Sequence, residues 1–135
     1  MVKILFVDDD HLALQLMKRV AEICGCEAII CSSGLAALML IEVEKPDLIM
    51  LDLNLQDIHG IKFINLLRRN KKIAKTPVVV LSAEKFYSEE VTKKLSEADG
   101  YIHKPLRLDD LPLLIEKYVN KRKSKTPSVN KYMSF

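Results

Sequence analysis

The sequence predicts an α/β protein in which five strands form a parallel, doubly wound sheet flanked by five helices. Segments with strand character alternate along the chain with segments whose apolar residues have helical spacing. Three of the strand-like segments are apolar without alternation, as strands buried on both faces of a parallel sheet must be. Alternating strands and helices are joined by right-handed crossovers, which place helices on both faces of the sheet.

The expected strands are short, and a chain of 135 residues with this pattern is expected to form one domain. They lie at residues 3–7, 27–31, 47–51, 77–81 and 100–103. The first, third and fourth are the continuous apolar runs, which indicates burial on both of their faces.

The expected helices cover residues 10–24, 34–44, 60–70 and 84–97, and a fifth begins near residue 110. The pair Ser32-Ser33 is placed to cap the second helix, and Asp109 or Asp110 the fifth, whose first turn tolerates Pro112. The residues expected to face the core are Ala13, Leu16, Met17, Val20 and Cys24; Ala36, Met39, Leu40 and Val43; Phe63, Ile64 and Leu67; and Leu111, Leu114, Ile115 and Tyr118.

Charge is unevenly distributed along the chain. Residues 1–116 hold 15 basic and 18 acidic side chains, whereas residues 117–135 hold six basic and no acidic ones. We therefore expect a mildly acidic domain over residues 1–121 and a flexible basic tail or linker over 122–135. No apolar run approaches the ~20 residues of a membrane-spanning helix, and no secretion signal opens the chain, which favours a cytoplasmic protein.

Polar residues that can bind ligands or take part in a reaction follow the expected strands. Asp8 and Asp9 follow the first strand, Asp52 the third, Ser82 the fourth and Lys104 the fifth. The carboxyl ends of parallel strands meet at one edge of the sheet, where ligands bind in open α/β folds. If the strand order is 2-1-3-4-5, the four contributing strands are neighbours, and these side chains converge on one pocket.

Such a group of side chains suits phosphoryl transfer. Clustered carboxylates repel one another and need a cation, and an oxygen-only set of ligands favours Mg²⁺. With the ion bound, one carboxylate can attack a phosphoryl donor while an ammonium neutralises the phosphoryl oxygens and a hydroxyl bonds to another of them.

The chain also resembles the receiver domains of two-component response regulators, of the single-domain type, over about residues 2–120. Four segments carry the resemblance: Val7-Asp8-Asp9-Asp10, Leu51-Asp52-Leu53-Asn54, Leu81-Ser82-Ala83 and Tyr101-Ile102-His103-Lys104-Pro105. The resemblance implies a flavodoxin-like fold with strand order 2-1-3-4-5. It also implies a signalling phosphoacceptor rather than an enzyme, although such a domain assists its own phosphorylation and slow dephosphorylation.

The resemblance implies a role for each site residue. Asp52 would be the phosphoacceptor. Asp9, Asp52 and the backbone carbonyl of Asn54 would ligate Mg²⁺, with Asp8 acting largely through a bound water. Lys104 would pair with a phosphoryl oxygen.

A switch and a set of partners are implied as well. Ser82 would bond another phosphoryl oxygen and Tyr101 would turn in response, changing a face formed by residues 84–97, the fifth strand and the fifth helix. The phosphoryl donor would be a histidine kinase or a histidine phosphotransfer protein. A downstream protein or a second copy of the chain would bind the changed face.

Some residues depart from the family pattern, and two other functions stay open. Gln56 replaces the usual proline, and His59 stands where an acid or asparagine is common. An aspartyl-phosphate phosphatase of the haloacid-dehalogenase type needs a second acid at the position of Asn54, which cannot transfer a proton, so rapid turnover is not expected. The basic tail favours nonspecific nucleic-acid binding only weakly. Asp10 and Asp57 are interpreted as a helix-start acid and a loop acid.

Overall fold

A single parallel sheet organises the protein. The computed structural model describes residues 1–83, 89, 93 and 95–123, with side chains as far as Val119. The strands are β1 (Lys3–Val7), β2 (Glu27–Cys31), β3 (Leu48–Asp52), β4 (Val78–Ser82) and β5 (Gly100–His103). All four neighbouring pairs are parallel, and the order is β2-β1-β3-β4-β5. The predicted fold class and strand order are therefore confirmed.

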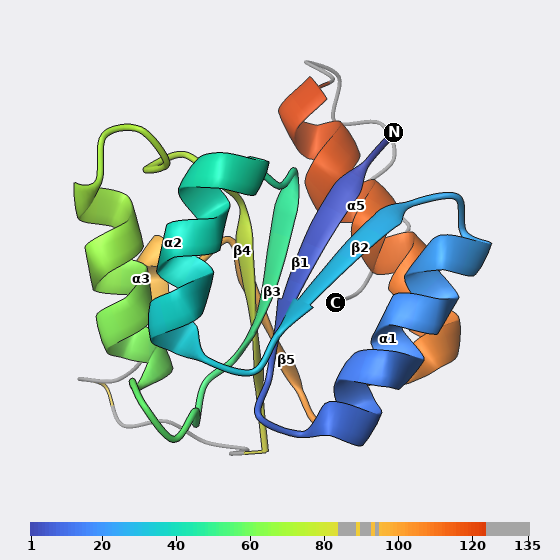
Figure 1. The fold of residues 1–135 in the computed structure, drawn as a ribbon, viewed down its shortest axis with the longest axis horizontal. Helices are drawn as coiled ribbons and strands as arrows, with labels where there is room; N and C mark the ends of the chain where they lie inside the picture. Colours follow the sequence, from blue (N-terminus) through green and yellow to red (C-terminus); the bar gives the residue numbers. More distant parts are fainter. Residues whose placement is uncertain (84–88, 90–92, 94, 124–135) are drawn as a thin grey trace.

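Helices cover both faces of this sheet. They are α1 (His11–Ile23), α2 (Gly34–Glu44), α3 (Gly60–Arg69) and α5 (Leu111–Lys123), with 3-10 turns η1 (Leu95–Glu97) and η2 (Leu108–Asp110). The helices α2 and α3 lie on one face of the sheet, and α1 and α5 lie on the other (Figure 1). The helix expected at 84–97 falls mostly outside the described residues, and its last three residues form η1.

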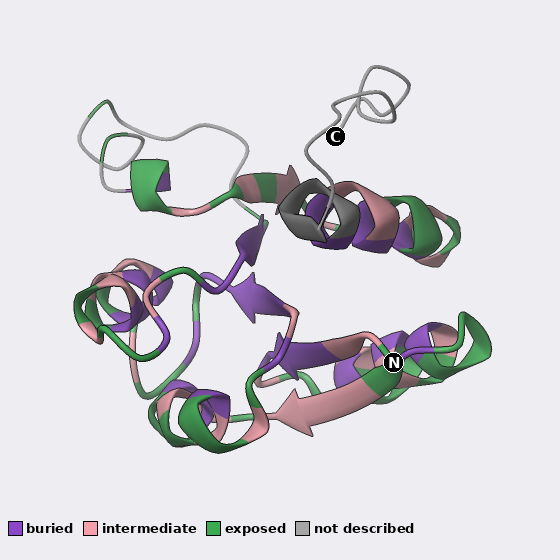
Figure 2. Cartoon of the chain, turned by 90° about the horizontal axis from the view of Figure 1, so that it is seen from above, coloured by how far each residue is buried: buried purple, intermediate pink, exposed green. Residues whose placement is uncertain are grey.

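Each face of the sheet has its own apolar core. Ile4 and Phe6 of β1 pack toward α1 and α5, whereas Leu5 and Val7 pack toward α2 and α3. Successive side chains of a strand point to opposite faces, so a strand covered on both sides must be apolar at every position. Figure 2 shows the buried central strands between the two helical layers, with the edge strand β2 only partly buried.

The inward faces of two helices were predicted correctly. All three expected residues of α3 and all four of α5 are buried. In α1 the prediction was partly wrong, because Met17 is buried but Leu14 and Ala21 fill the core in place of Leu16 and Cys24. Leu12, Leu14 and Leu16 are all apolar, so more than one helical stripe fits this segment.

The prediction for α2 was wrong. Ala37 and Ile41 are buried, whereas Met39 is 75% exposed and Val43 is 77% exposed. The physical reason is that this helix is apolar on nearly every side, so the spacing of its apolar residues does not identify a core-facing stripe.

Several element ends differ from the expected ones by a residue or two. Both β3 and β4 lie one residue later than predicted, so Asp52 and Ser82 are the last residues of their strands. The helix α5 begins at Leu111 and continues to Lys123, which makes the first two residues of the expected tail helical; residues 124–135 lie outside the described part. Among the described helices, none is both long and apolar enough to cross a bilayer.

Candidate functional site

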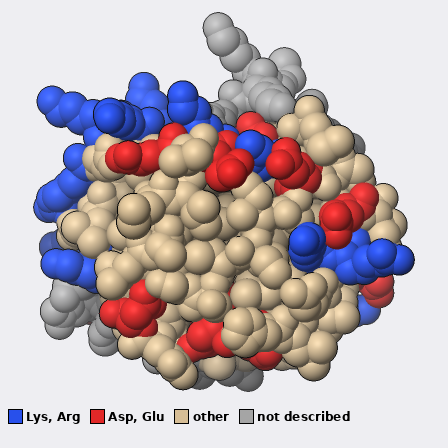
Figure 3. Space-filling model, viewed as in Figure 1, with Lys and Arg blue, Asp and Glu red and all other residues tan. Residues whose placement is uncertain are grey.

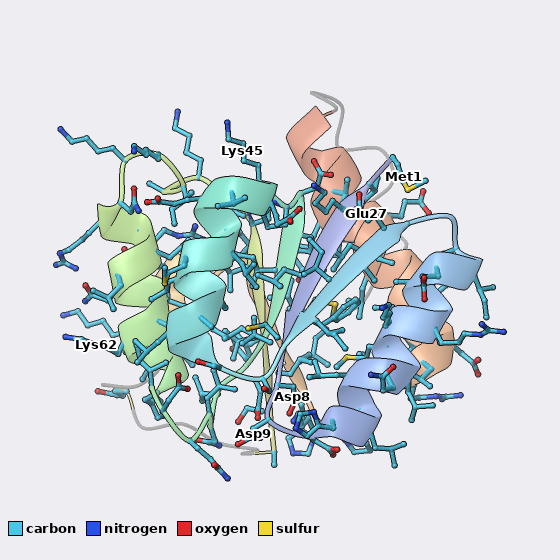
Figure 4. The ribbon with its side chains drawn as sticks, in the orientation of Figure 1. Met1, Asp8, Asp9, Glu27, Lys45 and Lys62 are labelled. Carbon is cyan, nitrogen blue, oxygen red and sulfur yellow. The ribbon has the colours of Figure 1, made fainter. Side chains whose placement is uncertain are left out.

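Three carboxylates meet at the carboxyl end of the sheet. Asp8 follows β1 and Asp52 ends β3, and these two strands are hydrogen-bonded neighbours. One oxygen from each of Asp8, Asp9 and Asp52 lies within 4.8 Å of the others. Asp8 is 1% exposed and Asp52 is 6% exposed, while Asp9 is half-buried. Figure 4 shows Asp8 and Asp9 at this end of the sheet. The spacing and chemistry of these oxygens fit a small, hard divalent cation.

Lys104 brings a positive charge to the same group. Its ammonium nitrogen lies 3.2 Å from Oδ2 of Asp8 and 3.3 Å from Oδ1 of Asp52. The chain reaches this point directly from β5, and the Lys104 backbone N–H donates to the Ser82 carbonyl over 2.7 Å. The Lys104–Pro105 peptide bond is cis. One ammonium is thus shared between two largely buried carboxylates.

The pKa values of this group follow from burial and from the charge count. Burial raises the pKa of Asp52; the Lys104 ammonium opposes this rise and the Asp8 carboxylate adds to it, so the pKa is higher than usual. Burial alone would lower the pKa of Lys104, but the attraction of Asp52 and Asp8 outweighs it and raises the pKa. Lys104 is therefore charged at neutral pH. Three carboxylates and one ammonium leave an excess of negative charge, which a divalent cation would neutralise.

Ser82 and Tyr101 stand on the neighbouring strands β4 and β5. Ser82 is fully buried at the end of β4 and pairs in register with His103. Tyr101 pairs with Val80, which lies two residues before Ser82 on β4, and its side chain is 55% exposed. The two predicted switch residues are therefore close in the sheet, one inside the protein and the other at its surface.

The loop between β3 and α3 borders the carboxylates. The backbone N–H of Asn54 lies 3.5 Å from Oδ1 of Asp52, at the limit of a hydrogen bond, and Asn54 forms an isolated bridge with His59. The ring of His59 caps α3 by accepting from the N–H of Ile61 over 3.2 Å. Gly60 follows, where a side chain would collide with the backbone of Leu53 at 2.9 Å. The loop thus folds back tightly on the end of β3.

Two further acids of the region cap helices. Asp10 caps α1, where its Oδ1 accepts from the N–H groups of Leu12 and Ala13, as its interpretation as a helix-start acid predicted. Asp57 belongs to the loop but bonds to the first turn of α2, a role that the sequence analysis missed. Its partners precede it by more than 20 residues, so no local spacing signals the contact.

Positive charge gathers at the opposite end of the molecule. Between Ile58 and Ala83 the sequence has six basic residues and no acidic one, and five of the six follow Leu67, in or after the last turn of α3. Figure 3 shows basic side chains over the carboxyl-terminal ends of α2 and α3, and Lys45 lies at the other end of the molecule from Asp8 and Asp9 in Figure 4. Although the net charge of the chain is +3, the pocket formed by Asp8, Asp9 and Asp52 is acidic, and its local electric field favours cations.

Fold and site together define a doubly wound, flavodoxin-like α/β domain with an acidic pocket at the carboxyl ends of its strands. The family model of the response regulator receiver domain matches residues 4–116. The chain therefore belongs to the receiver domain family of response regulators.

Relatives of known name and structure agree with this assignment. The polar-differentiation response regulator DivK of Brucella ovis is 28% identical over 116 residues, which cover 86% of this chain and 94% of DivK. A CheY-like receiver domain protein of Methanospirillum hungatei superposes with a TM-score of 0.83 at 26% identity, covering 93% of this chain and 99% of the other. The chemotaxis response regulator CheY4 of Vibrio cholerae gives a TM-score of 0.79 at 25% identity, covering 87% and 98%.

Proposed function

We propose that this receiver domain accepts a phosphoryl group on Asp52, with Mg²⁺ bound beside it. The observation that carries the proposal is the position of Lys104, whose ammonium contacts both Asp8 and Asp52 at the mouth of a pocket with excess negative charge. Asp8, Asp9, Asp52 and the backbone carbonyl of Asn54 would hold the ion. When bound, Mg²⁺ would neutralise the carboxylates and the phosphoryl oxygens.

The chemistry assigned to Asp52 is nucleophilic. A side-chain oxygen of Asp52 forms a bond to phosphorus as the P–N bond of a phosphohistidine breaks, and the bonding electron pair returns to the imidazole nitrogen of the donor. The Lys104 ammonium moves its contact from the carboxylate to a phosphoryl oxygen as charge develops there. The hydroxyl of Ser82, at the end of the adjacent strand β4, donates to another phosphoryl oxygen.

A histidine kinase or histidine phosphotransfer protein is the proposed donor, and an apolar hollow beside the pocket supports this assignment. The hollow has a volume of about 500 Å³ and lies between α1 and the segment after β5. Its apolar lining includes Leu16 and Met17 of α1 and Leu106 and Leu108 after β5, with Asp8, Asp10 and Lys104 also lining it. Leu16 is exposed at the edge of this hollow, and we assign it a role as a docking residue.

The proposed output is a change in the face that contains β5 and α5. Movement of the Ser82 hydroxyl toward a phosphoryl group would vacate space at the end of β4, and the exposed ring of Tyr101 on β5 would turn inward to fill it. Residues 84–97 would complete the responsive face, where a downstream protein or a second copy would bind. Two alternative packings of this kind convert a local charge event into a surface change.

The alternative functions receive less support. A phosphatase of the haloacid-dehalogenase type would need an acid at the position of Asn54 to transfer a proton, so we propose a signalling domain and not an enzyme. We also propose that the domain acts in the cytoplasm. Nucleic-acid binding through the basic tail stays a prediction, because residues 124–135 lie outside the described part.

The proposal is tested by incubating the protein with a small phosphodonor, such as phosphoramidate, with Mg²⁺ or with a chelator. One added phosphoryl group that requires Mg²⁺ supports it. Release of phosphate with rapid turnover would instead favour the phosphatase.

A further inference from the structure

Asp57, in the loop between β3 and α3, is bonded to the beginning of a different helix. Its Oδ1 accepts from the backbone N–H of Gly34 over 3.1 Å, and its Oδ2 accepts from the N–H of Leu35 over 3.0 Å. Oδ2 also accepts from the hydroxyl of Ser33 over 2.8 Å, and the Ser33 oxygen in turn accepts from the N–H of Ala36 over 3.1 Å. A single carboxylate thus receives three hydrogen bonds from the first turn of α2.

The charge of Asp57 strengthens this contact. The N–H of Leu35, together with the Ser33 hydroxyl and the N–H of Gly34, lowers the pKa of Asp57 to about 2, against a smaller opposing effect of burial. The carboxylate is therefore ionised at neutral pH. The negative charge of Asp57 lies at the start of α2, where the helix dipole favours an anion. The first N–H groups of a helix also have no partner within the helix and can donate to this carboxylate.

Apolar packing holds the same part of the loop against α2. A Cβ atom placed on Gly34 would lie 2.2 Å from Cγ2 of Ile58 and 3.0 Å from Cδ1 of Leu55. The loop residues therefore rest directly on the backbone at the start of α2, and only glycine permits this approach. Asp57, between Leu55 and Ile58 in sequence, supplies the directional bonds of this contact.

Apolar packing and hydrogen bonds at its two ends also hold the loop, since Leu53 and Leu55 are buried in the core. At its ends, the N–H of Leu53 donates to the Leu81 carbonyl over 2.9 Å, and the N–H of Gly60 donates to the Leu53 carbonyl over 2.8 Å. Between these points, within the described part of the chain, the hydrogen-bonding contacts of Asn54 are a long one of 3.5 Å to Asp52 and its bridge to His59. Leu53 and Leu55 hold the chain on either side of Asn54 by packing, and Asp57 adds the directional hydrogen bonds that fix the loop three residues later.

We propose that Asp57 is a positioning residue for the phosphorylation site. By fastening the loop to α2, it holds the Asn54 carbonyl and the Asp52 carboxylate in the arrangement that binds Mg²⁺ and accepts a phosphoryl group. This inference rests on the proposed function of Asp52. Asp57 itself contacts neither the ion nor the phosphoryl group.

The test compares the wild type with Asp57→Ala, Asp57→Asn and a matched control, Asp47→Ala. Asp47 also accepts a backbone N–H with its carboxylate, from Lys3 over 2.8 Å, but it precedes β3 at the opposite end of the sheet. We expect Asp57→Ala to weaken Mg²⁺ binding and to slow phosphorylation by phosphoramidate, each roughly tenfold. Asp57→Asn, which keeps one acceptor oxygen, should lie between the wild type and Asp57→Ala.

The control separates positioning from general stability. Asp47→Ala should lower the melting temperature as Asp57→Ala does, while leaving Mg²⁺ affinity and phosphorylation rate at wild-type values. If Asp57→Ala and Asp57→Asn bind Mg²⁺ and accept phosphate like Asp47→Ala, Asp57 has only a structural role and the inference is wrong. If Asp57→Ala fails to fold, Asp57→Asn decides by the same two measurements. A wild type that neither binds Mg²⁺ nor accepts phosphate would overturn the proposed function itself.

Discussion

The ammonium of Lys104 lies 3.3 Å from Oδ1 of Asp52, although β4 lies between β3, which ends at Asp52, and β5, which Lys104 follows. The same nitrogen lies 3.2 Å from Oδ2 of Asp8, so one cation serves two buried carboxylates. This arrangement explains why the pKa of Lys104 is raised while that of Asp52 is raised as well: the lysine has two anionic partners, and Asp52 has one cation to offset both burial and Asp8.

The first prediction concerns this lysine. Lys104→Met keeps an unbranched side chain but removes the charge that would stabilise the developing phosphoryl charge, so phosphorylation by a small donor should slow about a hundredfold. Mg²⁺ affinity should not fall, because a repelling cation has been removed. Lys104→Arg, which keeps the charge, is the control. Unchanged rates in Lys104→Met would show that the lysine takes no part in transfer.

The second prediction concerns Asp9. Asp9 supplies one of the three clustered carboxylate oxygens and is the most exposed of the three residues, so it can be removed with little damage to the core. Asp9→Ala should weaken Mg²⁺ binding roughly tenfold, since affinity follows the number of charged ligands. Calorimetric titration of both proteins measures this effect, and equal dissociation constants would place the ion elsewhere.

The third prediction follows from the raised pKa of Asp52. A carboxyl group whose pKa is higher in the folded than in the unfolded protein binds its proton more tightly when folded, so stability is lost as pH rises through these two pKa values. Asp52→Asn removes this loss. Without Mg²⁺, its melting temperature should exceed that of the wild type by a few degrees at pH 7.

The same argument sets the control for Asp52→Asn. Below the unfolded pKa of about 3.9, Asp52 is protonated in both states, and the difference between the two proteins should disappear. Saturating Mg²⁺ should also reduce the difference in melting temperature. The ion binds the folded state, and it binds the wild-type site, which keeps all three carboxylates, more tightly than the site of Asp52→Asn. A less stable Asp52→Asn at pH 7 would contradict the electrostatic account of the pocket.

The fourth prediction concerns the switch. Ser82→Ala removes a fully buried hydroxyl at the end of β4 but leaves the carboxylates and Lys104 in place. The variant should still accept phosphate on Asp52, whereas the amide shifts of Tyr101 and of residues 84–97 should respond much less to a phosphoryl mimic than in the wild type. Shift changes as large as in the wild type would rule out coupling through Ser82.

The sequence predicted the fold and the cluster of carboxylates because both depend on patterns that one strand displays by itself. Continuous apolar runs such as Leu48–Leu51 identify strands buried on both faces, and an acid at the end of such a run must lie at the ligand-binding edge of the sheet. The convergence of Asp8 and Asp52 also requires the strand order, which the resemblance to receiver domains implied and the structure confirms.

The contacts that the sequence did not predict depend on how separate elements meet. Apolar residues surround α2, so its spacing could not show that Ala37 faces the core and Met39 faces solvent. The bonds of Asp57 to Gly34 and Leu35 join a loop to a helix more than 20 residues earlier, and no local pattern records such a pair.

The most direct test of the account is the intact mass of the wild type and of Asp52→Asn after incubation with phosphoramidate and Mg²⁺. Asp52→Asn keeps the shape of the side chain but lacks the nucleophilic oxygen. The account predicts that the wild type gains the mass of one phosphoryl group, that a chelator prevents this gain, and that Asp52→Asn gains none. An equal gain at an equal rate in Asp52→Asn would contradict the central claim that Asp52 is the phosphoacceptor.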